Sequence, residues 1–138
     1  MKNPFKDLFI LDLANNHFGD VTHAKKIIQK FSDISRRKKI KSAIKFQLRD
    51  YNSYIHKSFL SSEDKYVRRF LDTKLEIDEF KKLFNHVKKN KLLTACTPFD
   101  ENSVDVIEKF KFDYLKIASV SSNDFRLLKR VVKKFCCL

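Results

Sequence analysis

Hydrophobic positions along the chain follow two different periods in alternation. Four short runs, at residues 5–14, 41–47, 92–97 and 114–119, are apolar enough to predict strands. The segments that follow them carry apolar residues every three or four positions, which is typical of amphipathic helices. The first run is almost continuously apolar over residues 8–11, so it predicts a strand that is buried on both faces.

The predicted helices have recognisable beginnings and apolar faces. Asp20, Asp100 and Asn123 are residue types that commonly precede the first turn of a helix. The side chains expected to face the core are Ala24, Ile27, Ile28, Phe31 and Ile34, then Ile77, Phe80, Leu83, Phe84 and Val87, then Val104, Ile107 and Phe110, and finally Phe125, Leu128, Val131, Val132 and Phe135.

The order strand then helix is repeated four times with no hairpin signal, which predicts a parallel sheet with right-handed crossovers. Such an α/β chain can form an open doubly wound sheet or part of a (β/α)8 barrel. One glycine cannot build the glycine-rich phosphate loop of nucleotide-binding folds, and polar residues lie at the carboxyl ends of all four predicted strands. We therefore expect TIM-barrel-like parallel β/α repeats, with the 138 residues forming a single domain of four units, a half barrel.

The connection between the second strand and the next clear helix, residues 48–71, is long. It carries Tyr51, Tyr54, His56 and Tyr66, and a short helix is expected around Tyr66. Connections of this length are uncommon in compact domains unless they cover a site.

The formal net charge is +13, from 30 Lys and Arg against 17 Asp and Glu, and it attracts anions of many kinds. The basic runs at residues 36–39 and 88–91 fall where helices should end, which suits the negative end of the helix dipole. The phenylalanines keep the spacing of internal positions and are not interleaved with the basic residues on one face. Nucleic-acid binding is therefore not favoured.

The three cysteines indicate a reducing compartment. Cys96, Cys136 and Cys137 form neither an even set nor a metal-ligand spacing, so the cytoplasm is expected. The apolar run near the amino terminus is interrupted by Asp12 and fits neither a signal peptide nor a membrane span. No base is evident near Cys96, which is expected to be a small buried residue, while Cys136 and Cys137 are expected to belong to a frayed end.

Polar residues at the strand ends are the candidates for chemistry. Lys45 and Gln47 alternate with apolar residues, so both point to one face of the second strand. The full set near the carboxyl ends of the strands is Asp12, Lys45, Gln47, Thr97, Lys116 and Ser119.

This set allows two interpretations, and the spacing does not decide between them. Two lysines and two hydroxyls that converge could bind a phosphate or a carboxylate, with Asp12 binding hydroxyls or acting as a base. Alternatively, Asp12 only forms a buried ion pair with Lys45 or Lys116, because an unpaired charge in a core is costly. His17 is read from its position as a loop histidine, and His23, His56 and His86 have no partners at metal-ligand spacing.

Four motifs occur in a fixed order: NNHFGD from Asn15, AIKFQ from Ala43, CTPFD from Cys96 and YLKIAS from Tyr114. Together they resemble the N-terminal catalytic region of the sialic acid synthase family, which includes legionaminic and pseudaminic acid synthases and spore-coat polysaccharide relatives. The resemblance extends over nearly the whole chain. It implies a (β/α)8 barrel that condenses phosphoenolpyruvate with N-acetylmannosamine or a related amino sugar, releases phosphate and uses manganese or magnesium.

The resemblance also implies roles for individual residues. Lys45 and Lys116 would hold the carboxylate and the phosphate of phosphoenolpyruvate, and Thr97 and Ser119 would donate hydrogen bonds to the same groups. Asp12 stands where the family usually has glutamate, which is thought to contact the sugar and assist proton transfer.

Three further residues are implied on the sugar side of the site. Gln47 would lie beside the sugar. Asn16 and His17 match the loop that follows the family's glutamate, so both are expected to bind substrate.

The chain also departs from the family pattern. Asp12 is one methylene shorter than glutamate, which is enough to misplace a catalytic carboxylate. Ala14 and Val120 stand where glycine is usual, and Cys96 where serine is usual. The family's metal-binding histidines lie in the second half of its barrel, so no metal ligand is expected in this chain, and the antifreeze-like domain is expected to be absent too.

We therefore expect a truncated synthase-like protein with little or no activity alone. The alternative is a non-catalytic remnant that binds an anion or assembles with another chain. A homodimer or a chain carrying the second barrel half could complete such a barrel, because the first and fourth strands would otherwise have unpaired edges.

Overall fold

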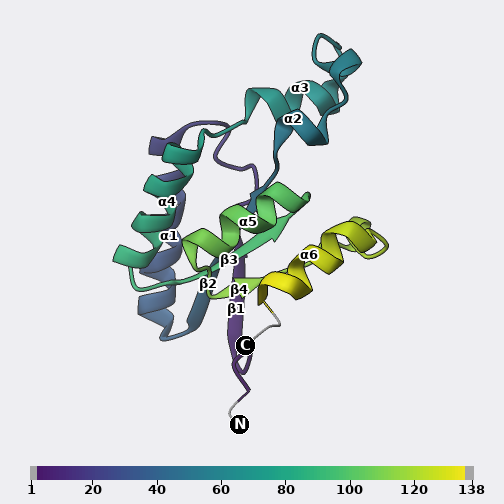
Figure 1. Ribbon diagram of the computed structural model, residues 1–138. Coiled ribbons are helices and arrows are strands. Elements are labelled where there is room, and N and C mark those ends of the chain that lie inside the picture. Colours follow the sequence, from purple (N-terminus) through teal and green to yellow (C-terminus); the bar gives the residue numbers. More distant parts are fainter. Residues whose placement is uncertain (1–2, 136–138) are drawn as a thin grey trace. The chain divides into compact units, whose positions relative to one another are not determined.

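The computed structural model describes residues 3–135, in which strands and helices alternate (Figure 1). The strands are β1 (Leu8–Asp12), β2 (Lys41–Leu48), β3 (Leu93–Pro98) and β4 (Tyr114–Leu115). They form one parallel sheet in the order β1-β2-β3-β4, which leaves β1 and β4 at its edges. The expected parallel β/α repeat is confirmed. Cys136 and Cys137, expected at a frayed end, lie outside the described residues.

The helices are α1 (Val21–Lys38), α2 (Tyr51–Tyr54), α3 (Lys65–Asp72), α4 (Ile77–Lys89), α5 (Glu101–Phe110) and α6 (Phe125–Phe135), with short 3-10 turns η1 (Lys57–Phe59) and η2 (Ser119–Ser121). The connector after β2 holds α2, η1 and α3, so the helix predicted around Tyr66 is confirmed. No helix within residues 3–135 is long and apolar enough to cross a membrane.

The chain packs as two compact units. The first consists of the residues up to 46 together with residues 72–95. In it α1 and α4 lie side by side and pack against each other (Figure 1). Ile28 of α1, Ile44 of β2 and Leu83 of α4 are completely buried, and the rings of Phe46 and Phe80 lie 5.1 Å apart. Burial of these large apolar side chains is the main stabilising contribution to this unit.

Helix α1 begins where the sequence predicts, but its buried face differs from the predicted one near its end. Asp20 caps the helix as expected, since its carboxylate accepts from the N–H groups of Thr22 and His23 at 2.6 and 3.1 Å. Ile34, however, is 44% exposed, and Ser35 is buried instead. The Ser35 hydroxyl is satisfied by the Ser42 hydroxyl of β2 at 2.9 Å, so a small polar pair takes the place of an apolar contact.

The second unit consists of residues 47–71 and the residues from 96 onward. Here α5 and α6 pack together, and the guanidinium of Arg130 binds both carboxylate oxygens of Asp105 at 2.5 and 2.8 Å. The predicted face of α6 is wrong in part, because Phe125 and Val132 are 70% and 55% exposed and Leu127 is buried instead. The other predicted residues, Leu128, Val131 and Phe135, are half-buried. The cap of α6 is Asp124, not Asn123, because the Asp124 carboxylate accepts from the N–H groups of the first turn.

The two edge strands depart most from expectation. β1 is not buried on both faces, because Phe9 and Ile10, which point to opposite faces, are 53% and 46% exposed. β4 ends at Leu115, although a strand as far as Ser119 was expected. Lys116, which was expected within this strand, follows it and is exposed. Edge strands have a neighbour on one side only, and an apolar run does not report how many neighbours a strand will have.

Candidate functional site

Lys45 is the centre of the first group of candidate residues. It is paired in register with Asp12 across β1 and β2, and its ammonium lies 2.7 Å from the Asp12 carboxylate. The Lys45 side chain is 15% exposed, whereas that of Asp12 is 48% exposed. The Lys45 carbonyl also accepts the N–H groups of Leu13 and Ala14, at 3.0 and 3.3 Å. Lys45 therefore fixes the turn that leaves β1 through both its backbone and its charge.

The turn after β1 uses a backbone conformation that L-residues rarely adopt. Ala14 has a φ of 42°, in the left-handed region that favours glycine. The resembling family has glycine at this position, and alanine in that conformation costs about 1 kcal/mol. The hydrogen bonds to Lys45 and complete burial of Leu13 hold the turn in place against this strain.

His17 has a structural task in the same loop. It is buried, and its Nδ1 accepts the backbone N–H of Gly19 at 3.0 Å. Gly19 has a φ of 74°, and a Cβ there would lie 3.0 Å from the carbonyl oxygen of Asp72. Burial, together with nearby His23, lowers the pKa of His17. The neutral ring is therefore the form that holds the loop, with Nε2 left to face any other partner.

Thr97 is a buried polar residue at the end of β3, in the second unit. It is 2% exposed on β3, and its hydroxyl has no hydrogen-bond partner among residues 3–135. A buried hydroxyl without a partner costs about 1–3 kcal/mol, so such a group indicates a place for a ligand or a water. Its neighbour Cys96 is fully buried, and burial raises the pKa of the thiol far above its usual range. Burial therefore favours the protonated thiol and disfavours a thiolate nucleophile at this position.

Lys116 and Ser119 follow the short strand β4. The Lys116 N–H donates to the Cys96 carbonyl at 3.0 Å, which places the start of this segment beside β3 close to Thr97. Both side chains are exposed, and Ser119 begins the turn η2. Both side chains are therefore accessible. Lys116 follows directly on β4, whereas Ser119 lies four residues beyond the end of that strand.

Arg49 is not among the site residues predicted from the sequence. Its guanidinium carbon lies 3.8 Å from the ring centre of Phe99, 4.8 Å from that of Phe70 and 5.4 Å from that of Tyr54. One of its nitrogens donates to the Gln47 side-chain oxygen at 2.9 Å, and its Nε is buried without a partner among residues 3–135. The signal was present, because Lys45, Gln47 and Arg49 continue the period of two along one strand face.

Arg49 ties the long connector to β3. Phe70 lies on α3, Tyr54 on α2 and Phe99 just after β3, so the three rings come from separate elements. A second link reinforces the first, since the Asp50 N–H donates to the Asp100 carboxylate at 2.7 Å. Cation–π contacts of this kind contribute about 0.5–2 kcal/mol each when sheltered from water. The connector is thus a packed segment at the carboxyl ends of β2 and β3.

Of the expected site residues, the structure brings Asp12 and Lys45 into direct contact and sets Gln47 against Arg49. Asn16 is exposed, with its N–H bonded to the Leu13 carbonyl at 2.9 Å. Within residues 3–135 no group of three or more His, Cys, Asp or Glu side chains is arranged to hold a metal ion. The described residues therefore do not fit the divalent metal that the resemblance implies.

Comparison with known proteins gives a consistent picture. The sequence model of the NeuB family matches residues 36–136. An N,N'-diacetyllegionaminic acid synthase of Campylobacter jejuni is 30% identical over 142 residues, which cover 93% of this chain and 40% of that protein. These matches agree with the resemblance seen in the four motifs.

Solved structures agree as well. A Chromobacterium violaceum protein described as spore coat polysaccharide biosynthesis protein E superposes with a TM-score of 0.88 at 39% identity, covering 92% of this chain and 38% of its own. An N-acetylneuraminic acid synthetase of Leptospira borgpetersenii, solved with citrate, gives 0.75 at 24% identity, with 93% and 41% covered, and shows the shared fold. The chain thus spans about two fifths of the length of each of these proteins.

The lowered pKa of His17 predicts a pH dependence of stability. Well above pH 6.5, the usual value, the ring is neutral in both the folded and the unfolded chain and has no effect on stability. As the pH falls below 6.5, the unfolded chain takes up the proton first, so the free energy of unfolding decreases until the folded-state pKa is passed. Each unit by which that pKa is lowered is worth about 1.4 kcal/mol.

Denaturant titrations between pH 7.5 and 5 of the parent chain and of His17→Gln test this. The variant should lose less stability than the parent over that range. His86, whose pKa is also lowered by burial, is present in both proteins and cancels in the comparison. Identical pH profiles would show that His17 is not held neutral by the loop.

Proposed function

The chain belongs to the NeuB family, and we propose that it carries the phosphoenolpyruvate-binding part of a synthase that makes nonulosonic acids. The other proposed substrate is N-acetylmannosamine or a related N-acetylated amino sugar. Three observations support this: the four motifs in order, the family match over residues 36–136, and a 30% identical relative that is a diacetyllegionaminic acid synthase. The proposed location is the cytoplasm, where such sugars and phosphoenolpyruvate are at hand.

The unsatisfied hydroxyl of Thr97 is the observation that carries the proposal. Its 2% exposure and lack of a partner leave one buried donor at a strand end of the second unit. Hydrogen bonds to an ionised acceptor contribute about 1.5–3 kcal/mol, more than those to a neutral one. A carboxylate or phosphate oxygen of phosphoenolpyruvate would satisfy this donor, with the Ser119 hydroxyl as a second one.

The two lysines are proposed to neutralise the same substrate. Phosphoenolpyruvate carries a carboxylate and a phosphate, so a site that binds it must supply several positive charges in a sheltered place. Lys45, mostly buried, would exchange part of its bond with Asp12 for the substrate anion. Lys116, which is exposed at the end of β4, is open to an anion from solvent. Each lysine takes this role from the motif in which it lies.

On the sugar side, Arg49 is proposed to orient Gln47. Because the Gln47 oxygen already accepts from Arg49, its amide N–H groups remain to donate to a sugar oxygen. Asp12, half exposed, is proposed as the group that contacts the sugar and moves a proton. Asn16 and the Nε2 of His17 are proposed as further sugar contacts in the loop that follows.

The proposed reaction forms a carbon–carbon bond and breaks a carbon–oxygen bond. The enol carbon of phosphoenolpyruvate attacks the sugar aldehyde, water adds to the neighbouring carbon, and phosphate leaves. Lys45, Lys116, Thr97 and Ser119 would bind the anionic groups, and Asp12 would exchange a proton with the aldehyde oxygen. Relatives of this kind use a divalent metal, but the described residues do not fit one, so no step is assigned to it here.

A partner chain is proposed to complete the barrel, which this chain would enter as one domain of four β/α units. β1 and β4 are edge strands, and Phe9 and Ile10 leave apolar surface exposed on both faces of β1. An exposed apolar edge of this kind is open to pairing with a further strand. The partner would be a second copy or a chain carrying the other barrel half.

A second candidate function is a non-catalytic anion-binding module. Two departures favour it: Asp12 is shorter than the glutamate of the family, and Ala14 forces a strained turn beside it. In that case the chain would bind phosphoenolpyruvate without turning it over.

Thr97→Val tests the phosphoenolpyruvate site. The substitution replaces the hydroxyl by a methyl group of the same shape, so the affinity for phosphoenolpyruvate should fall about tenfold or more. The free energy of unfolding should stay the same or rise, because no existing hydrogen bond is lost. Isothermal titration calorimetry gives the affinity, and denaturant unfolding gives the stability.

Thr94→Val is the matched control on the same strand. Thr94 points to the opposite face of β3 and already has a partner, so its replacement should lower stability and leave the affinity unchanged. Equal affinities of Thr97→Val and the parent chain, or no binding by the parent, would contradict the proposed site.

Turnover by the chain alone should be at background level. Purified chain supplied with phosphoenolpyruvate, N-acetylmannosamine and manganese should release phosphate no faster than the Lys45→Met variant does. The reason is that the described residues fit no metal and the carboxylate of Asp12 is short. Robust phosphate release that Lys45→Met abolishes would show a complete active site in this chain.

A further inference from the structure

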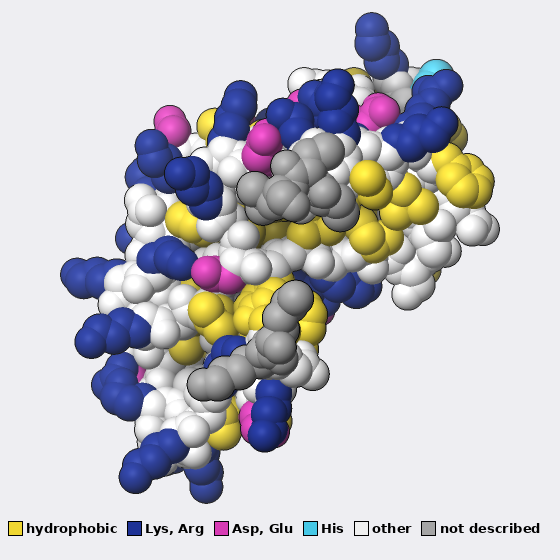
Figure 2. All heavy atoms as spheres, turned by 60° about the horizontal axis from the view of Figure 1, so that its bottom comes forward, with side chains coloured by type: hydrophobic (Ala, Val, Ile, Leu, Met, Phe, Trp, Pro, Cys, Tyr) yellow, Lys and Arg dark blue, Asp and Glu magenta, His cyan; other side chains and the backbone are white. Residues whose placement is uncertain are grey.

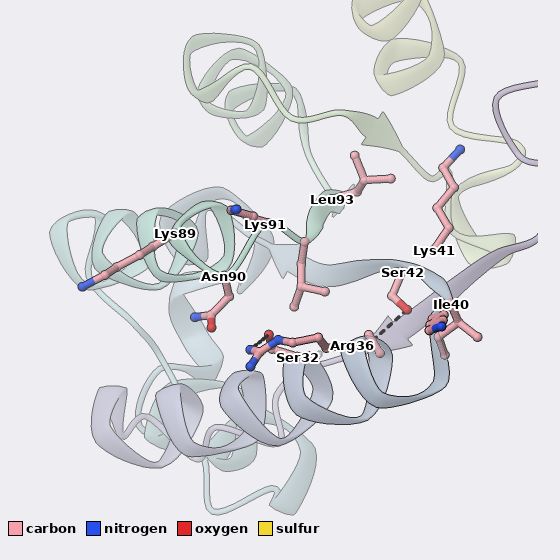
Figure 3. A pocket seen from close by; sticks show the side chains of 12 residues that line it. Ser32, Arg36, Ile40, Lys41, Ser42, Lys89, Asn90, Lys91 and Leu93 are labelled. Atoms are coloured by element: carbon pink, nitrogen blue, oxygen red, sulfur yellow. Dashed lines mark hydrogen bonds between the residues drawn. The ribbon is translucent and has the colours of Figure 1, made fainter.

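A basic hollow lies in the first unit, at the amino ends of β2 and β3. Lysine and arginine side chains are spread over the molecular face drawn in Figure 2, with few acidic ones between them. The hollow in Figure 3 has a volume of about 630 Å³, within the usual range for small-molecule sites. Its lining includes five cations and no carboxylate: Arg36, Lys39, Lys41, Lys89 and Lys91.

Arg36 is the cation that faces the hollow. Its guanidinium lies over Ser32 and points toward Asn90 at the end of α4 (Figure 3). It donates to the Ser32 hydroxyl at 3.3 Å, and the Asp33 carboxylate lies 3.6 Å away. Most of its donors remain open, since the side chain is 70% exposed. A guanidinium with a free edge is the group that best fits a phosphate in two-point contact.

The lysines act at longer range. Lys41 donates to the Pro4 carbonyl at 2.6 Å, and both Lys41 and Lys89 extend away from the hollow in Figure 3. In the described part of the chain no carboxylate forms an ion pair with Lys39, Lys89 or Lys91. Their side chains are long and flexible, so each ammonium can turn toward an anion bound in the hollow that these residues line.

Helix ends alone do not account for this charge. α1 and α4 both end here, and each carboxyl end carries about half a negative charge. Those two ends and Asp33 amount to about two negative charges, against five positive ones. The positive potential that remains is available to a ligand.

The lining of the hollow also includes apolar side chains, which a bare ion would not contact. Ile40, Leu92 and Leu93 line it beside the cations, and the buried pair of Ser35 and Ser42 forms part of its floor. We propose that this hollow binds a small phosphorylated molecule of about nucleotide size, with its phosphate on Arg36 and an apolar ring against Ile40 and Leu92. The site is separate from the proposed phosphoenolpyruvate site, because it lies at the opposite ends of the strands and shares no residue with it.

Arg36→Gln and Arg37→Gln form a matched pair for the test. Both residues are in the last turn of α1, both are exposed, and both substitutions remove one positive charge, but Arg37 does not line the hollow. Calorimetric titration with ADP in 50 mM salt should show saturable binding to the parent chain. Arg36→Gln should weaken it about tenfold or more, and Arg37→Gln by less than twofold.

Two outcomes would overturn the proposal. One is the absence of saturable ADP binding up to millimolar concentration. The other is an equal loss of affinity in both variants, which would mean that ADP responds only to overall charge. Thermal unfolding of both variants serves as the folding control, since exposed side chains at this turn should change stability little.

Random duplex DNA separates the proposed ligand from a general polyanion. Its binding should be weak, strongly dependent on salt, and reduced alike by the two substitutions. Duplex binding that depends on Arg36 and not on Arg37, and that outcompetes ADP, would assign the hollow to nucleic acid and contradict the proposal.

Discussion

The contact on which the first unit depends is the one between Lys45 and the end of β1. A single residue binds the Asp12 carboxylate through its ammonium and two N–H groups through its carbonyl. These bonds end β1, begin the loop toward α1 and allow the strained φ of Ala14. The same ammonium is the proposed ligand of an anion. If the proposal holds, the substrate and Asp12 would compete for this ammonium, so substrate binding would disturb the ion pair at the turn.

In the second unit, a cation packed among aromatic rings holds the polar end of β2 in place. Arg49 packs between three aromatic rings from α2, α3 and the residue after β3, and it fixes the Gln47 amide. Thr97 is left with a buried hydroxyl that nothing in the described chain satisfies. Packing holds this strand end in place, and the Thr97 hydroxyl is the donor that is proposed to bind the substrate.

The repeat of strand and helix, the connector helix α3 and the caps Asp20 and Asp100 could be predicted from the sequence, because they depend on local spacing and on single side chains. The exposure of β1 and the shortness of β4 could not be predicted. Both depend on how many strands pair with each of them, and the residues of a strand do not specify that number. The ion pair of Asp12 with Lys45 was one of two open readings, and the structure shows it, with Asp12 half exposed rather than buried. The direction of the Arg49 side chain could have been predicted, since it continues the alternation along the strand. Its contacts with Phe70 and Phe99 could not, because these rings are distant in sequence.

The measurement that tests the central claim most directly is a nuclear magnetic resonance titration of the 15N-labelled chain with phosphoenolpyruvate. The predicted result is a set of saturating amide shifts at residues 13–14, 45–48, 96–99 and 116–119, which lie in or next to the four motifs. The shifts at Leu13 and Ala14 should report the turn as Lys45 moves toward the substrate. Shifts confined to the basic surface around Arg36, or no saturating shifts at the strand ends, would contradict the account.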